Sequence, residues 1–221
     1  MIHSIPLREL FPGGSLVLDC WEGNEKFRSL VPRHFLDPRS FVDQAEDLTG
    51  RKYDRQTLRS VLEIQNSRFS AGRAAMANIE RISDPRSLVV IGGQQAGLFG
   101  GPLLTANKAM TVISLARRLE DQLRVPVIPV FWIASEDSDL AEVDRASILD
   151  RDGQLRELKL PGDENTRLPV SLIRFEDSLN GLLDELSDTL PETGLAAETL
   201  ASLRSAYAPG RTLAPTMIIG I

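Results

Sequence analysis

The sequence predicts an α/β fold, and two apolar runs with a helical segment between them carry this prediction. Residues 88–91 form a short apolar run that ends in glycines, which is typical of a buried strand. After Pro102 the pattern changes, and apolar residues recur at helical spacing as far as Leu123. A second apolar run occupies residues 127–134. Strand, glycine-rich loop, helix and strand in this order predict one parallel βαβ unit, which is right-handed by default.

Pro129 lies inside the second apolar run. Proline has no N–H group to donate to a ladder and is therefore disfavoured in a central strand. We expect the paired part of this strand to begin at Val130.

The first 50 residues are punctuated by prolines and predict largely irregular structure. Within them, residues 16–18 favour a short extended segment that ends at Asp19. Residues 38–48 favour an amphipathic helix that covers the core.

Residues 54–82 form the longest periodic segment of the chain, with an apolar stripe at helical spacing. We expect one core helix here, capped by Asp54 and bent near Gly72. Gln65 and Asn66 are polar residues at or beside the stripe. They either satisfy backbone groups or contact a ligand from a neighbouring element, and the sequence leaves both interpretations open.

The chain beyond the second apolar run mixes short strands with helices. Residues 146–160 predict a β-hairpin with a glycine in its turn, and residues 161–166 a polar loop. Residues 169–175 predict a further strand. Two leucine-rich stripes, residues 179–190 and 195–203, predict a helical hairpin.

The composition excludes several classes of function. A net charge of −6 and a pI of about 5.1 argue against a nucleic-acid surface, which needs clustered basic residues. Cys20 is the only cysteine and the chain has two histidines, so no Cys/His zinc site is expected, and no residue is assigned as a metal ligand. We expect Cys20 to be a small packing residue. The sequence shows no signal peptide and no membrane helix, and we expect a cytoplasmic protein that binds no membrane.

The loop at residues 92–102 is the strongest candidate for a binding site. It holds five glycines and runs into the start of a helix, where backbone N–H groups and the helix dipole favour a phosphate or a carboxylate. Gln94 and Gln95 add amide groups, and Lys108 could reach back as a cation. The loop matches neither of the standard nucleotide fingerprints, so a glycine-rich turn without a ligand is the alternative.

A cluster of acidic residues follows the second apolar run. In an open parallel sheet, ligands bind outside the carboxyl ends of the strands, and both unusual loops lie at that edge. Glu136, Asp137 and Asp139 could hold a metal, orient an amine or act as a base. We therefore expect Gln94 or Gln95 to share one cleft with Glu136 or Asp137.

Several motifs of the chain resemble one protein family. The segments GGQQAGLFGGPL, NKA and VPVIPVFWIASED, with FPGGSLVLD and QNSRFSAG upstream, are similar to the bacillithiol biosynthesis cysteine-adding enzymes, the BshC family. The resemblance covers most of residues 10–175. It implies a partial Rossmann-like core, related to class I aminoacyl-tRNA synthetases, with N-terminal helices and a mixed α+β connecting segment.

The resemblance also implies an activity and its partners. Family members join L-cysteine to glucosaminyl-malate, the last step in making bacillithiol, and ATP is a candidate cofactor. Full-length relatives are more than twice this length and dimerise through a C-terminal coiled coil that has no counterpart here. The chain is then an N-terminal fragment, which alone we expect to have little or no ligase activity and to self-associate. The alternatives are an inactive remnant or small-ligand-binding module on the same fold, or a different nucleotidyl-type enzyme.

The resemblance divides the chain and assigns its candidate residues. It implies an N-terminal part of the core at residues 1–145, a connecting segment at 146–208 and a truncated tail at 209–221, in which we expect no strand. The candidate catalytic residues are Glu136, Asp137 and Asp139. The candidate residues for binding substrate or nucleotide are Gln94, Gln95, Gly97, Gly100, Asn107, Lys108 and Trp132. Asn107 and Ser138 stand where relatives often carry histidine, and neither can shuttle a proton near neutral pH.

Overall fold

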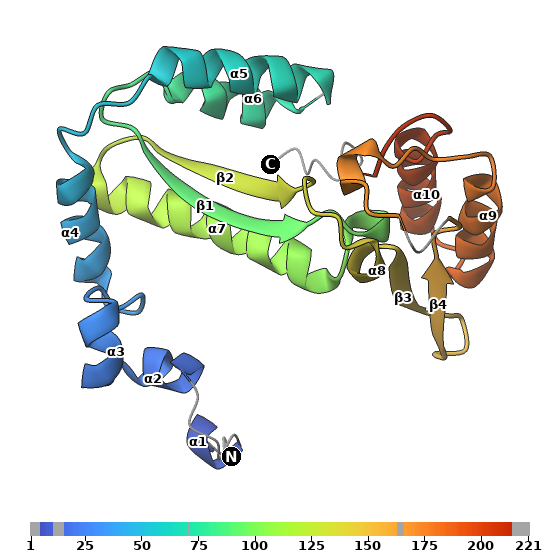
Figure 1. The fold of residues 1–221 in the computed structure, drawn as a ribbon, viewed down its shortest axis with the longest axis horizontal. Helices are drawn as coiled ribbons and strands as arrows, with labels where there is room; N and C mark the ends of the chain where they lie inside the picture. The colour runs from blue at the N-terminus through green and yellow to red at the C-terminus, as the bar shows by residue number, and fades with distance from the viewer. Residues whose placement is uncertain (1–4, 11–15, 70, 163–165, 214–221) are drawn as a thin grey trace. The chain divides into compact units, whose positions relative to one another are not determined.

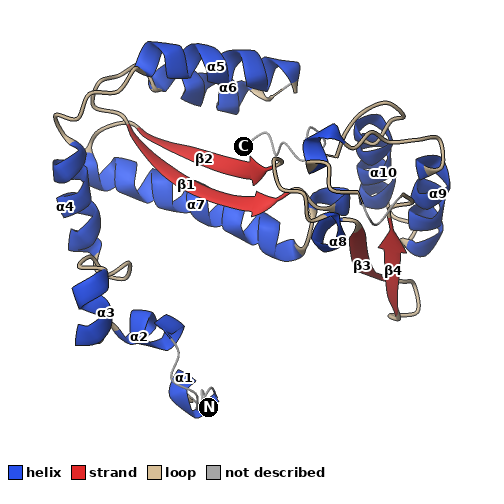
Figure 2. Ribbon diagram, viewed as in Figure 1, coloured by secondary structure: helices blue, strands red, loops and turns tan. Residues whose placement is uncertain are grey.

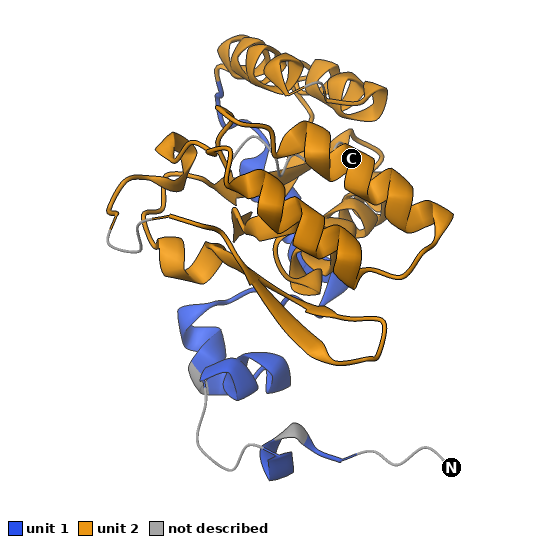
Figure 3. Ribbon diagram, turned by 90° about the vertical axis from the view of Figure 1, so that its right-hand side faces the viewer, with its two compact units in different colours: residues 1–53 blue, residues 54–221 orange. Residues whose placement is uncertain are grey.

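A computed structural model describes residues 5–10, 16–69, 71–162 and 166–213 of the 221. The chain divides into two compact units, Met1–Tyr53 and Asp54–Ile221 (Figure 3). The C-terminal tail predicted from residue 209 lies mostly outside the described residues. By length and hydropathy, no helix within the described ranges could serve as a membrane span.

The first unit is helical (Figure 2). Its helices are α1 (Leu7–Leu10), α2 (Leu16–Glu22), α3 (Glu25–Leu30) and α4 (Pro38–Leu48). The predictions of irregular structure and of an extended segment at residues 16–18 are therefore wrong. Three consecutive apolar residues have no readable period, and only Leu18 of the three is buried. Arg8 pairs with Asp19 and Glu22, one helical turn apart on α2, at 2.7 and 2.6 Å.

Helix α4 confirms the prediction of a helix at residues 38–48. Asp37 caps it by accepting a hydrogen bond from the backbone N–H of Arg39. Pro38 occupies the first helical position, where its missing N–H costs nothing. That this helix covers the core stays a prediction.

The predicted βαβ unit is present in the second unit. Strands β1 (Leu88–Gln95) and β2 (Val127–Ala134) pair in parallel, from Leu88 opposite Val127 to Gln95 opposite Ala134. Helix α7 (Leu103–Leu123) connects them and packs along the sheet (Figure 1). Both strands thus end at the same edge of the sheet.

Strand β1 is longer than the sequence predicts, because Gly92 and Gly93 belong to the strand and not to the loop. A Cβ at Gly92 would lie 2.5 Å from Cγ2 of Val112 on α7, and one at Gly93 would lie 2.8 Å from the carbonyl oxygen of Trp132 on β2. These glycines permit close packing on a helix and on a neighbouring strand, which their spacing in sequence does not reveal. The loop therefore begins after Gln95.

Strand β2 is paired along its whole length, so the expectation that pairing begins at Val130 is wrong. Pro129 lies opposite Val90 in the register. Leu88 N donates to Pro126 O, and the alternation of a parallel ladder then directs the nitrogen of Pro129 away from β1. No strand pairs with that side of β2 in the described part of the chain, so the missing N–H breaks no ladder bond.

Residues 54–82 form two helices and not one bent helix. Helices α5 (Arg55–Arg68) and α6 (Arg73–Arg81) lie side by side (Figure 1). The chain reverses between them, with Gly72 in an extended conformation before α6. Asp54 caps α5 as predicted, accepting a hydrogen bond from Thr57 N at 3.1 Å. No residue of α5 is buried, and Leu58 and Val61 on its apolar stripe are exposed, whereas Ile79 of α6 is buried. The expected core helix is therefore wrong over its first half.

Polar contacts fasten this helical pair to the sheet. The guanidinium of Arg55 on α5 donates to Oγ and to the carbonyl oxygen of Ser87, at 2.6 and 3.0 Å, just before β1 begins. Helix α6 packs against β2. The pair α5–α6 is thereby placed beside β2.

The remaining elements come after β1 or after β2 in the chain. They are η1 (Leu98–Gly100), α8 (Leu140–Val143), β3 (Arg145–Leu149), β4 (Leu155–Lys159), η2 (Val170–Leu172), α9 (Leu179–Thr189) and α10 (Gly194–Ala206). The antiparallel pair β3–β4 confirms the predicted β-hairpin, and α9–α10 confirm the helical hairpin. The strand predicted at 169–175 is wrong, because η2 and a single bridge between Arg174 and Thr212 stand there.

A cluster of buried hydrophobic residues joins these elements to the end of β1. It packs Ala96 and Leu98, just after β1, against α8, β4 and α9. Its members are Ala96, Leu98, Leu140, Val143, Leu158, Leu160, Val170, Phe175, Leu179, Leu182, Leu183, Leu186, Tyr207 and Leu213. The loops at the carboxyl edge are therefore supported by a buried hydrophobic cluster.

Glu120, on the last turns of α7, makes the stability of this unit depend on pH. Its carboxylate accepts hydrogen bonds from Val127 N, at 2.9 Å, and from Arg81, and these bonds lower the pKa of Glu120. A lowered folded-state pKa gives stability that is present above the ordinary glutamate pKa of 4.5 and is lost as pH falls through the lowered value.

We therefore expect the urea midpoint of Glu120→Gln to fall less steeply than that of the wild-type chain when pH is lowered from 7 to 3. Asp121→Asn, an exposed neighbour on the same helix, is the control. Identical pH profiles for Glu120→Gln and the wild type would contradict the prediction.

Candidate functional site

The ends of β1 and β2 are joined by a side-chain network. Gln95 is the last residue of β1, and its Nε2 donates to Oδ2 of Asp137 at 2.8 Å and to Oε2 of Glu142 at 2.5 Å. Asp137 lies in the acidic loop after β2, and Glu142 lies on α8. The structure thus brings together Gln95 and Asp137, which the sequence predicts as neighbours.

Glu142 was not among the candidate residues. It lies five residues beyond Asp137, and the short helix α8 turns the chain so that its side chain returns to Gln95. In the sequence, Glu142 is one more acidic residue after the second strand, and its spacing does not distinguish it from the others.

Asp137 is held as a carboxylate. Its pKa is lowered first by the hydrogen bond from Gln95, then by the backbone N–H of Asp139, which donates to Oδ1 at 3.1 Å. A carboxyl group with a lowered pKa stays charged near neutral pH and is a poor proton donor. Its chemistry is that of a partner for an ammonium group or another cation.

Gln94 and Lys108 form a second pair at this edge. Nζ of Lys108, on the second turn of α7, donates to Oε1 of Gln94 at 2.6 Å. This contact leaves the amide NH₂ of Gln94 and the charge of Lys108 together, a combination that suits a carboxylate or a phosphate. Asn107, the neighbour of Lys108, is exposed on the same turn.

The glycine loop between β1 and α7 is tightly folded. Gly97 is buried, and a Cβ on it would lie 2.7 Å from Cα of Gly101. Gly100 has φ +96° and Gly101 φ +75°, which favour glycine. Pro102, at the N-cap of α7, makes no side-chain hydrogen bond to the helix, so no cap covers the first backbone N–H groups of α7. That Gly97 and Gly100 approach a ligand stays a prediction.

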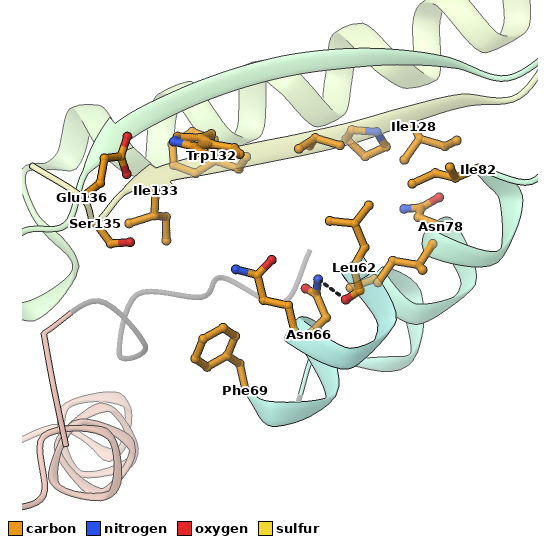
Figure 4. Close-up of a pocket in the computed structure, with 16 residues that line it drawn as sticks. Leu62, Asn66, Phe69, Asn78, Ile82, Ile128, Trp132, Ile133, Ser135 and Glu136 are labelled. Carbon is orange, nitrogen blue, oxygen red and sulfur yellow. Dashed lines mark hydrogen bonds between the residues drawn. The ribbon is translucent and has the colours of Figure 1, made fainter. Parts of the chain in front are cut away.

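A pocket of about 280 Å³ lies between β2 and the helices α5 and α6. In Figure 4 the labelled side chains of α5 lie on one side of it, and Trp132, Ser135 and Glu136 lie on the other. Trp132 is 59% exposed. Among the candidate residues, Trp132 and Glu136 line this pocket, whereas Gln95 and Asp137 belong to the network described above.

Gln65 and Asn66 also line the pocket. Nδ2 of Asn66 donates to the carbonyl oxygen of Leu62 at 2.8 Å, so this residue satisfies a backbone group and lines the cavity at once. Neither of the two alternatives drawn from the sequence therefore excludes the other.

The acidic candidates do not converge on one point. Within residues 5–10, 16–69, 71–162 and 166–213, no three His, Cys, Asp or Glu side chains are grouped as metal ligands. Glu136 and Asp139 are exposed, as is Ser138 between them.

Comparison with known proteins places this chain in a family. A family model described as "Bacillithiol biosynthesis BshC, N-terminal Rossmann-like domain" matches residues 2–218. The chain belongs to the BshC family. The α/β, Rossmann-like fold and the family resemblance expected from the sequence are thereby confirmed.

Curated BshC relatives give the extent of the likeness. The chain is 38% identical over 177 residues to a protein of Geobacillus kaustophilus, which covers 80% of this chain and 32% of the relative. It is 41% identical over 210 residues to a protein of Koribacter versatilis, covering 95% and 38%. It is 37% identical over 222 residues to a protein of Symbiobacterium thermophilum, covering 97% and 39%.

All three BshC relatives carry the name "Putative cysteine ligase BshC". The chain spans about a third of their length, between 32% and 39%.

Proposed function

We propose that this chain supplies the N-terminal Rossmann-like part of a ligase that joins L-cysteine to glucosaminyl-malate in bacillithiol biosynthesis. The observation that carries the proposal is the bond between Gln95 and Asp137, which unites the carboxyl ends of both parallel strands in a chain of the BshC family. The reaction forms a C–N bond between two small molecules in the cytoplasm. ATP is the candidate source of energy for it, and the full-length protein acts as a homodimer.

The two polar pairs divide the work of binding. Gln94 and Lys108 hold an acidic group, for which the carboxylate of L-cysteine and a phosphate are the candidates. Asp137 and Gln95 hold an amine, and Glu136 and Asp139 flank them in the same loop. Trp132 and Glu136 border the pocket beside β2 and contact the larger substrate there.

The proposal is tested by removing the gene from an organism that carries it. Bacillithiol should disappear and glucosaminyl-malate should accumulate, as followed by mass spectrometry. Reintroduced wild-type gene and Glu198→Gln, an exposed change on α10, should restore bacillithiol to the same level, and Asp137→Asn should not. Unchanged bacillithiol after deletion would favour the alternative, an inactive remnant or small-ligand-binding module on the same fold.

The charge of Lys108 should matter for binding and not for folding. Lys108→Ala should weaken binding of L-cysteine about tenfold, because the cation next to Gln94 is lost. The unfolding free energy should change by under about 0.5 kcal/mol, since Lys108 is exposed on the helix surface. Calorimetry and urea unfolding measure the two effects, and equal affinity in both chains would mean that Lys108 is only a solvated residue.

A further inference from the structure

The side-chain amide of Gln95 is held in one orientation. A glutamine amide has two donor hydrogens on Nε2 and one acceptor oxygen, Oε1. Asp137 and Glu142 are both acceptors, so together they take up the two hydrogens of Nε2. A flipped amide would set its oxygen against two carboxylates. Oε1 is therefore the atom of Gln95 that remains to accept a hydrogen bond.

The side-chain amide of Gln94 has the opposite orientation, with its oxygen in the hydrogen bond and its NH₂ group left over. The ammonium of Lys108 can only donate, so the amide oxygen of Gln94 must face it. The NH₂ group of Gln94 then remains to donate. Two consecutive glutamines thus present opposite chemistry, an acceptor from Gln95 and a donor from Gln94.

We propose that Glu142 is a positioning residue: with Asp137 it fixes the amide of Gln95 so that Oε1 accepts a hydrogen bond from the amine of the substrate. This inference rests on the proposed function and adds the residue that sets the preference for an amine at this site. Asp137 alone fixes one hydrogen of Nε2, and Glu142 fixes the second, which removes rotation of the amide toward solvent. Glu142 acts through Gln95 and does not touch the substrate.

The alternative roles of Glu142 can be separated by two substitutions. Glu142→Gln keeps an oxygen that accepts from Gln95 but removes the charge. Glu142→Ala removes both. A positioning role predicts that Glu142→Gln behaves like the wild-type chain, whereas a direct electrostatic contact with the ligand predicts that it behaves like Glu142→Ala.

A first measurement needs no ligand. The Nε2 hydrogens of Gln95 are observed by ¹H–¹⁵N NMR of the 221-residue chain and assigned by their absence in Gln95→Ala. We expect two well-separated signals in the wild type and in Glu142→Gln. In Glu142→Ala they should move toward the values of a solvent-exposed glutamine. Unchanged signals in Glu142→Ala would overturn the proposal.

A second measurement compares L-cysteine with 3-mercaptopropionate, which has the same thiol and carboxylate but no amine. Glu142→Ala should weaken L-cysteine binding about tenfold, the size of one hydrogen bond to a charged group, and leave 3-mercaptopropionate unchanged. Glu142→Gln should bind both as the wild type does. Equal loss for both compounds, or a Glu142→Gln variant as weak as Glu142→Ala, would overturn the positioning role. If the wild-type chain binds neither compound, the substrate part of this inference is overturned, whereas signals of Gln95 that move only in Glu142→Ala would still show that Glu142 orders its amide.

Discussion

Asp137→Asn should reduce the affinity of the chain for L-cysteine about a hundredfold, the largest effect we expect at the site. The substitution removes the negative charge of Asp137, whose pKa is lowered chiefly by the hydrogen bond from Gln95. One oxygen of Asp137 accepts from Gln95 at 2.8 Å and the other from Asp139 N at 3.1 Å, so the NH₂ of an asparagine must face one of these two donors. One of the two hydrogen bonds is therefore lost together with the charge.

Calorimetric titration with L-cysteine measures this loss, and 3-mercaptopropionate serves as the reference ligand without an amine. Its binding should fall far less, because Gln94 and Lys108 remain intact. Glu198→Gln on α10 is the matched carboxylate-to-amide control. An Asp137→Asn chain that binds L-cysteine as the wild type does would remove Asp137 from the site.

Gly97→Ala should destabilise the second unit by about 2–3 kcal/mol, the largest effect on folding that we expect. The added Cβ would lie 2.7 Å from Cα of Gly101, and backbone cannot turn away as a side-chain end can. Relief requires that the glycine loop separate from the start of α7. The same movement would displace Leu98, which is fully buried in the large cluster.

Urea unfolding measures the change, and Gly181→Ala is the control. Gly181 lies in α9 with no atom within 4 Å of an added Cβ, so alanine there should stabilise the chain by about 0.5–1 kcal/mol. A Gly97→Ala chain as stable as the wild type would show that the loop has room to adjust.

The helices and strands that are marked by a regular spacing of apolar residues or by turn residues were predictable from the sequence. Helices α4, α7 and α9 and the hairpin β3–β4 fall where apolar spacing and turn residues indicate them. Two of the errors share one cause, which is that contacts between residues distant in sequence decided the structure. Gly92 and Gly93 are typical of a loop until Val112 and Trp132 are placed against them, and the stripe over residues 54–82 does not reveal that the chain reverses within it.

One contact of the candidate site, between Gln95 and Asp137, was predictable in the same way. Gln95 and Asp137 follow two apolar runs, and the topology of parallel strands alone brings such residues to one edge. Glu142 was missed because the short helix α8 returns it to Gln95. A helix of a single turn is too short to leave a periodic pattern in the sequence. The pocket beside β2 depends on how two separate helices pack, which is a tertiary property.

Pro129 gives β2 a protection that a chain of ordinary residues would lack. A strand whose outer side has no partner among the described residues offers a row of alternating donors and acceptors to any neighbouring molecule. At Pro129 that row lacks one donor and carries a rigid ring in its place. An incoming strand would lose a ladder bond in the middle of β2 and meet the ring there. The same residue that weakens the case for a strand in the sequence therefore also makes the outer side of β2 a poorer template for an incoming strand.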